Sequence, residues 1–148
     1  MNRIAALLIG TWFGMQISAY LIAPVLFDRL NSSQAGGIAG ILFSINAYSG
    51  LAVWLFSFFL IRHEHGHFFY RNSQRFDSLL ILIQMASLAF TQFVVTPVIS
   101  AHKNGVEHFL FHLSRSFSFW HGVSQSIYLF STVLGLVLVL RLLKFNIK

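Results

Sequence analysis

Residues 78–100 read SLLILIQMASLAFTQFVVTPVIS, and this stretch decides the fold class. It contains no Lys, Arg, Asp or Glu, and it is long enough for a helix to cross the hydrocarbon core, which takes about 20 apolar residues. Similar stretches lie at about 4–27, 36–61 and 119–142, and Arg141 is the one charged residue within them. The sequence therefore predicts an all-α integral membrane protein, a bundle of four transmembrane helices.

The composition places the whole chain in lipid rather than in water. Of its 148 residues, 56% are hydrophobic and only 9% are charged, whereas a typical soluble domain carries about 25% charged residues. We expect residues 1–148 to form one four-span membrane domain. The first apolar stretch is longer than a signal-peptide core of about 7–15 residues, so we expect it to be retained as a helix.

Most of the ten Lys and Arg residues fall near the two ends of the chain and between the second and third stretches. Loops rich in these residues stay on the cytoplasmic side of a membrane. The distribution predicts a multi-pass protein of the cell inner (plasma) membrane with both termini in the cytoplasm. The cytoplasmic group comprises Arg3, Arg62, Arg71, Arg75, Arg141, Lys144 and Lys148, and the opposite group Arg29, Lys103 and Arg115.

Small residues recur every four positions on the first two predicted helices. Gly10, Gly14 and Ser18 lie on one face of the first helix, and Gly36 and Gly40 on one face of the second. This spacing lets helix backbones approach closely in a membrane. We therefore predict that the first two helices pack together along these residues.

Two prolines indicate an internal repeat. Pro24 and Pro97 both lie near the ends of helices that run in the same direction. Such a pattern is typical of two parallel hairpins related by an axis along the membrane normal. The alternative is that proline is simply tolerated near the ends of membrane helices.

Polar residues follow one face of the fourth predicted helix, and lipid cannot satisfy them. One interpretation is a polar interior that holds an ion, a cofactor or a small solute. The other is hydrogen bonding between helices, worth about 0.6 kcal/mol per bond on average. The stripe consists of His121, Ser124, Gln125, Tyr128, Thr132 and Gly135, and Gln84, Gln16 and Asn46 on the other helices are candidates to face it.

Four histidines are expected at one end of the bundle. His121 lies within the fourth stretch and His102 just after the third, while His108 and His112 are four residues apart in the connection between them. Imidazole nitrogens bind haem iron and transition metals such as copper. The alternative is a polar connection that lies in the membrane interface, with no cofactor bound.

Several classes of function find no support in the sequence. Cysteine is absent, which excludes disulfides, thiolate nucleophiles and iron–sulfur clusters. No carboxylate lies within a span, and neither a glycine-rich phosphate loop nor a nucleophile elbow is present. The basic residues form no patch for nucleic acid, so an enzyme or a nucleic-acid-binding protein is the least favoured interpretation.

Four short motifs follow one another along the chain. They are Gly14-Met15-Gln16, residues 23–27 (APVLF), Ala35-Gly36 through Leu42-Phe43, and Phe119-Trp120-His121-Gly122. In these motifs the chain resembles the transmembrane protein 205-like family of bacteria and eukaryotes, and the similarity covers essentially the whole chain and all four spans. It implies a small four-helix membrane protein whose biochemistry is undefined, so no site residue carries over.

These observations favour a non-enzymatic membrane protein, a scaffold or accessory protein or a subunit of an assembly. Its expected partners are the lipid bilayer and either a second copy or other membrane proteins. Two alternatives stay open. One is a haem- or metal-binding protein that uses His121 and His102, and the other is a transporter or channel for ions or small solutes, formed as an oligomer.

Overall fold

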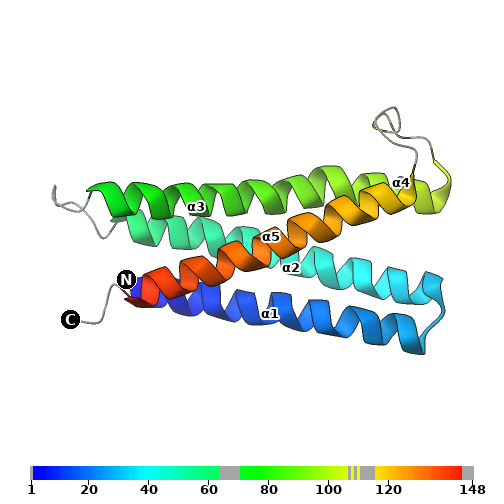
Figure 1. Ribbon diagram of the computed structural model, residues 1–148, viewed down its shortest axis with the longest axis horizontal. Helices are drawn as coiled ribbons and strands as arrows, with labels where there is room; N and C mark the ends of the chain where they lie inside the picture. Colours follow the sequence, from blue (N-terminus) through cyan, green and yellow to red (C-terminus); the bar gives the residue numbers. More distant parts are fainter. Residues whose placement is uncertain (1, 64–70, 107, 109, 111–115, 145–148) are drawn as a thin grey trace.

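A computed structural model describes residues 2–63, 71–106, 108, 110 and 116–144 (Figure 1). The helices are α1 (Asn2–Arg29), α2 (Ser32–His63), α3 (Arg71–Phe90), α4 (Thr96–Asn104) and α5 (Phe117–Lys144), and the short π-helix η1 (Thr91–Val95) joins α3 to α4. Among the residues so described there is no strand. With α3, η1 and α4 forming one span, four helices are long and apolar enough to cross a membrane, which confirms the predicted four-helix membrane bundle.

Local chemistry sets the helix boundaries at one end of the bundle. The Asn31 side chain accepts a hydrogen bond from the Gln34 N–H (2.9 Å), so Asn31 caps α2 and starts it before its apolar stretch. Gly105 ends α4 in the left-handed conformation (φ 65°), which glycine adopts without steric cost. The Asn31 cap thus fixes the start of α2, and Gly105 fixes the end of α4.

The helices form a ring in which each packs against two neighbours. α1 contacts α2 and α5, α2 contacts α3, and the α3–η1–α4 span contacts α5. Figure 1 shows the start of α1 and the end of α5 at one end of the bundle, called here the terminal end. The turn between α1 and α2 lies at the other end, the distal end. Along its length α5 crosses from α4 at the distal end to α1 at the terminal end (Figure 1).

Two tryptophans form the centre of the core. The Trp12 and Trp54 rings meet edge to face, 5.4 Å between centroids, and both are buried. Gly50 makes room for the Trp12 ring, because a Cβ there would lie 2.5 Å from Trp12 Nε1 and 2.9 Å from Leu88 Cδ1. The close approach of α1 to α2 therefore depends on a glycine packed against an indole.

A π-turn precedes the proline of the third span. Pro97 has no N–H to donate, and the Thr96 N–H and hydroxyl both point to the Thr91 carbonyl, five residues earlier. This extra residue in the turn lets the span continue through the proline. By contrast, Pro24 lies within the continuous helix α1. The two prolines therefore sit in different local structures, and the internal repeat stays a prediction.

An ion pair joins α3 to α5 at the terminal end. Arg141 Nε lies 2.7 Å from Asp77 Oδ1, and the guanidinium also covers the Phe76 ring at 4.8 Å. Asp77 is buried, so removal of either partner would leave a poorly solvated charge. This pair was not predicted, because Asp77 lies just before the apolar stretch 78–100.

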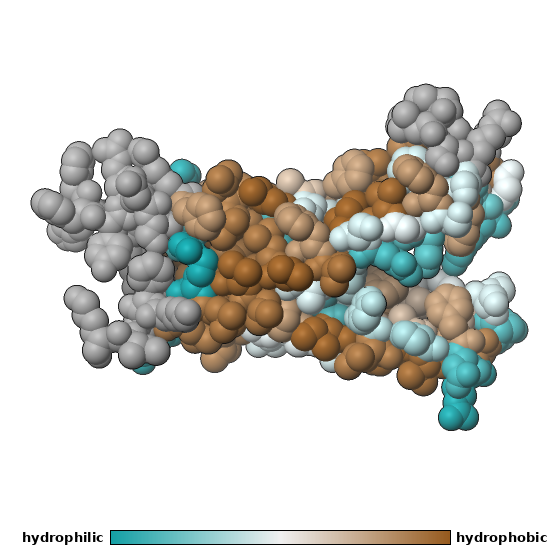
Figure 2. Space-filling model, viewed as in Figure 1, coloured by the Kyte–Doolittle hydropathy of each residue, from teal (hydrophilic) through white to brown (hydrophobic). Residues whose placement is uncertain are grey.

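The exterior of the bundle is apolar. Large hydrophobic side chains are exposed on every span, among them Leu7, Ile41, Phe93 and Leu129. Figure 2 shows hydrophobic residues over much of the visible face, with hydrophilic residues gathered towards the distal end and a smaller hydrophilic group near the terminal end. An exposed surface of this kind matches the hydrocarbon of a bilayer, and the chain is a multi-pass membrane protein.

Substituting Gly50 with Ala tests the close packing of α1 and α2. The added methyl group collides with Trp12 and Leu88, and such overpacking costs about 1–3 kcal/mol. We expect a lower melting temperature in detergent. Gly37→Ala is the matched control, since nothing lies within 4 Å of its Cβ position. Equal melting temperatures for Gly50→Ala and the wild type would contradict this packing.

Candidate functional site

Three amide side chains lie in the interior of the bundle, one from each of the first three spans. Gln16 of α1 and Gln84 of α3 are fully buried, and Asn46 of α2 is 3% exposed. All three were predicted to face the polar stripe of the fourth span. Together they are called here the interior amides.

Gln16 and Tyr128 hold α1 against α5. Gln16 Nε2 donates to Thr132 Oγ1 (2.7 Å) and to the Tyr128 carbonyl (3.3 Å). In return, the Tyr128 hydroxyl donates to the Gln16 carbonyl (2.7 Å). The two helices thus exchange hydrogen bonds in both directions at mid-length.

Gln84 makes the corresponding contact between α3 and α5. Its Nε2 donates to the hydroxyl of Ser131, which is 2% exposed. Because Ser131 directly precedes Thr132, Gln16 and Gln84 reach α5 at the same depth from two sides. Ser131 was not predicted, because the polar stripe follows one face of the fourth helix and Ser131 lies on another buried face.

Asn46 lies at the same level as Gln16. The main-chain carbonyl of Asn46 accepts hydrogen bonds from Trp12 Nε1 (2.9 Å) and from the Ser49 hydroxyl (3.1 Å). Trp12 packs beside Gly50, and one turn further towards the distal end these antiparallel helices carry Gln16 and Asn46. Gln84 lies nearer the terminal end, because the antiparallel helices α2 and α3 pack Gly50 beside Leu88 and Tyr48 beside Phe93.

Each of the interior amides keeps a side-chain oxygen that no described group satisfies. Gln16 Oε1, Asn46 Oδ1 and Gln84 Oε1 are buried and have no hydrogen-bond partner among the described residues. Two further groups on the buried face of α2, Trp54 Nε1 and Ser57 Oγ, are in the same position. An unsatisfied buried polar group costs about 1–3 kcal/mol. The bundle interior thus holds five buried polar atoms that can still form hydrogen bonds.

The distal half of the predicted stripe lies outside the bundle interior. His121 and Gln125 are exposed and contact each other through Nε2 atoms 3.2 Å apart, while Ser124 is half-buried. At Tyr128 the stripe passes from the surface into the bundle. The Tyr20 ring stacks on the Tyr128 ring (6.1 Å between centroids), and the Phe43 ring meets the Tyr128 ring edge to face (5.2 Å). The stripe thus runs from the distal surface inwards to Gln16.

The histidines are not assembled into a ligand set in the part of the chain that the structure describes. His102 and His121 contact the Phe117 ring, at 6.3 Å and 5.8 Å between centroids. The His108 ring accepts the Leu110 N–H (3.2 Å), and His112 lies outside the described residues. No group of three or more His, Cys, Asp or Glu able to hold a metal is found in the described ranges. Haem or copper binding stays a prediction.

The small-residue prediction is wrong for packing within one chain. Nothing lies within 4 Å of a Cβ position at Gly10, Gly14 or Gly40, while the position at Gly36 meets the Lys103 side chain of α4 and a more distant Phe27 atom. Ser18 is exposed, and its hydroxyl donates to the Gly14 carbonyl of its own helix (2.9 Å). The close approach occurs at Gly50 instead, because the bulky Trp12 requires it there.

The carboxylates with described side chains form no catalytic pair. Asp28 lies at the distal end beside Arg29 (3.6 Å), and Asp77 lies at the terminal end bound to Arg141. Glu64 and Glu107 fall outside the described residues. General acid–base chemistry by two neighbouring carboxylates therefore has no basis in the described part of the chain.

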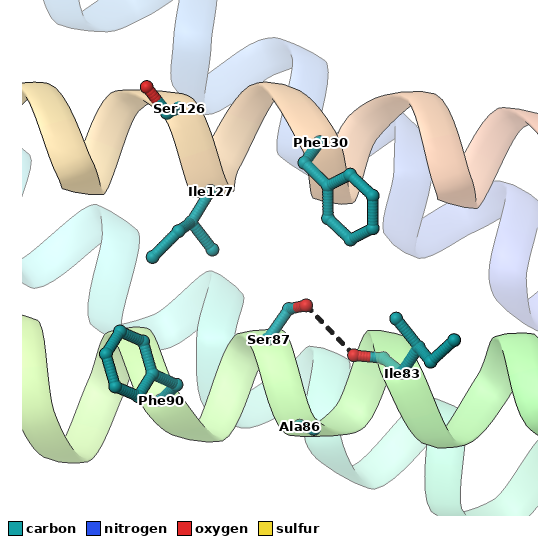
Figure 3. A pocket seen from close by; sticks show the side chains of 7 residues that line it. All are labelled: Ile83, Ala86, Ser87, Phe90, Ser126, Ile127 and Phe130. Atoms are coloured by element: carbon teal, nitrogen blue, oxygen red, sulfur yellow. Dashed lines mark hydrogen bonds between the residues drawn. The ribbon is translucent and has the colours of Figure 1, made fainter.

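A shallow groove of about 460 Å³ runs between α3 and α5 on the outer surface. Figure 3 shows the Ser87 hydroxyl turned back to the Ile83 carbonyl of its own helix (2.9 Å). The rest of the lining is almost wholly apolar, so the groove is part of the lipid-facing surface. It is lined by Ile83, Ala86, Ser87, Phe90, Ser126, Ile127 and Phe130.

A double-mutant cycle on Gln16→Leu and Thr132→Val tests the contact between α1 and α5. Because each change removes one partner of the 2.7 Å hydrogen bond, the two losses of stability should not add. From unfolding in mixed micelles we expect a coupling energy of about 0.6 to 1.7 kcal/mol, which are the average and the largest values measured for such bonds in membranes. Full additivity would contradict the contact. Pairing Ser87→Ala with Thr132→Val is the control, because Ser87 bonds only within its own helix.

Comparison with known proteins identifies the chain at the level of a family. A family described as a domain of unknown function (DUF4149) matches residues 7–108. No curated protein and no solved structure matches the chain. The match covers the first three spans, including Gln16, Asn46 and Gln84, and ends before α5.

Proposed function

The chain belongs to the DUF4149 family, and we propose that it is a non-enzymatic subunit of a membrane assembly that associates through the outward face of α1. The observation that carries this proposal is the open space beside the glycines of that face. Gly10 and Gly14 have nothing within 4 Å of their Cβ positions, and Gly14 and Ser18 are exposed.

A face of this kind is suited to another helix. Small residues let two backbones approach closely, and membrane helices associate through such packing rather than through the hydrophobic effect. The hydroxyls of this face are already satisfied, because Thr11 donates to the Leu7 carbonyl and Ser18 to the Gly14 carbonyl, both at 2.9 Å. The partner therefore needs only shape complementarity and no polar groups.

We propose a second copy of the chain as the partner. The face is self-complementary, since an α1 helix crossing its symmetry mate brings the same glycines together in a two-fold contact. Gly40 of α2 is also exposed with open space beside it, so a helix of the second copy could pack closely there as well.

Orientation and closer family relationship are parts of the same proposal. The basic residues favour an inner (plasma) membrane protein with the terminal end in the cytoplasm. The similarity to the transmembrane protein 205-like family includes Phe119-Trp120-His121-Gly122, which lies beyond the matched residues 7–108. That resemblance supports a four-helix membrane protein without a mapped catalytic site.

Gly14→Leu tests the proposed association in proteoliposomes. The leucine side chain separates the two α1 helices, and we expect dimerisation, measured by energy transfer between labelled copies, to weaken about tenfold or more. The melting temperature of the monomer in detergent should not fall, because the substituted position meets open space.

Gly122→Leu is the matched control, because Gly122 is also an exposed helical glycine with nothing within 4 Å of its Cβ position. It should dimerise as the wild type does. The proposal fails if the wild type shows no energy transfer. It also fails if Gly14→Leu and Gly122→Leu give equal dimerisation.

A further inference from the structure

We propose that one buried water molecule joins α2 to α3 through Trp54, Ser57 and Gln84, inside the membrane. All three side chains are fully buried. Trp54 Nε1, Ser57 Oγ and Gln84 Oε1 have no hydrogen-bond partner among the described residues. The site does not include Gln16 or Asn46, and it does not rest on the proposed association through α1.

The packing of α2 against α3 sets two of these side chains opposite each other. The helices are antiparallel, and a Cβ at Gly50 would lie 2.9 Å from Leu88 Cδ1. Trp54 follows Gly50 by about one turn towards the terminal end, and Gln84 precedes Leu88 by about one turn towards the same end. Trp54 and Gln84 therefore lie at one level of the bundle.

Ser57 shares the buried face of α2 with Trp54, since residues three apart are neighbours on a helix. Contacts with α5 place the cluster further. Trp54 Cζ2, close to the indole N–H, lies 3.9 Å from the Cβ position of Gly135, and Ser131, which accepts from Gln84 Nε2, lies one turn away on α5. The three polar atoms thus gather where α2, α3 and α5 meet.

Water matches this set of groups. The indole N–H of Trp54 only donates, the Ser57 hydroxyl donates and accepts, and the Gln84 amide, bonded to Ser131, has one polar atom left. Turning that amide round would leave an N–H there in place of the oxygen. A water molecule serves either arrangement, because it both donates and accepts, and buried waters typically make about three hydrogen bonds to such groups.

Size and charge also favour water. A buried water needs a space of only about 10–15 Å³. A methyl group at Gly135 would meet Trp12 and Trp54 atoms at 3.5 and 3.9 Å, which are ordinary contacts, so a group of about this size fits beside the indole. The three side chains are neutral, and an ion is poorly stabilised in a low-dielectric interior without a counter-charge.

The tryptophan indoles make the test possible. In ¹⁵N-tryptophan-labelled protein in nanodiscs of deuterated lipid, we would measure dipolar magnetisation transfer from water to each indole N–H, with Trp54→Phe to assign the resonance. We expect strong transfer to Trp54. Transfer to Trp12 should be several-fold weaker, because its buried N–H donates to the main-chain carbonyl of Asn46 (2.9 Å). Transfer to Trp54 no stronger than to Trp12 would overturn the proposal.

Ser57→Ala separates the water from the hydroxyl as the source of the signal. The transfer to Trp54 should persist in this variant, because the water keeps two partners, and its loss would contradict the proposal. The melting temperature should fall below that of Ser87→Ala, a control whose hydroxyl bonds its own helix. A higher melting temperature for Ser57→Ala would also contradict it, because removing a dry, unsatisfied hydroxyl stabilises a protein.

Gln84→Met tests the part of α3 in the site. The methionine removes one partner of the water, so transfer to Trp54 should fall several-fold. Gln16→Met is the matched control, because Gln16 is also a buried amide bonded to α5, and it should leave the transfer unchanged. Equal transfer in the two variants would exclude Gln84 from the site. If Gln84→Met does not fold, the wild-type and Ser57→Ala measurements still decide whether the water is present.

Discussion

A bilayer core supplies no hydrogen bonds, and the structure follows from where its polar side chains can go. Gln16, Asn46 and Gln84 lie on spans that contain no charge near them, and none can turn towards lipid without losing every partner. Burying them requires each of three helices to turn a polar position towards the interior of the bundle. α5 supplies hydroxyl acceptors from two consecutive residues, Ser131 for Gln84 of α3 and Thr132 for Gln16 of α1.

This constraint makes α5 the central element of the bundle. It binds α1 through Gln16 and Tyr128 and α3 through Gln84, and its terminal end is held by the pair of Arg141 with Asp77. Apolar contacts alone distinguish poorly between neighbouring registers of a membrane helix, because lipid competes equally for them. Polar contacts at two depths set the register of α5 against α3, and those with Gln16 set it against α1.

The small residues illustrate a second division, between inside and outside. Gly50 is needed where an indole fills the space between helices, whereas Gly14 leaves an open surface. Gly50 is required for packing within one chain, whereas Gly14 is available for contact with a second copy of the chain. A membrane protein with few polar surface groups must use such shape differences to choose its partners.

How much of this could be predicted from the sequence depends on the feature. The four spans follow from charge-free stretches such as 78–100, since length and hydropathy suffice for that inference. The amide side chains were recognised as interior candidates because lipid excludes them. The facing direction of Gly14 was not predictable, because a small-residue face has the same pattern whether its partner helix is internal or external. Ser131 and the Asp77–Arg141 pair were missed because they depend on how α5 crosses α3.

The position of α5 between α1 and α3 is the central claim, and thiol cross-linking in membranes tests it most directly, because the chain has no cysteine. The account predicts that a short thiol-to-thiol cross-linker joins Gln84→Cys to Ser131→Cys, and joins Gln16→Cys to Thr132→Cys. It predicts no intramolecular product for Leu82→Cys with Leu129→Cys, two exposed positions on α3 and α5. Cross-linking of the exposed pair with none at the two buried pairs would contradict it.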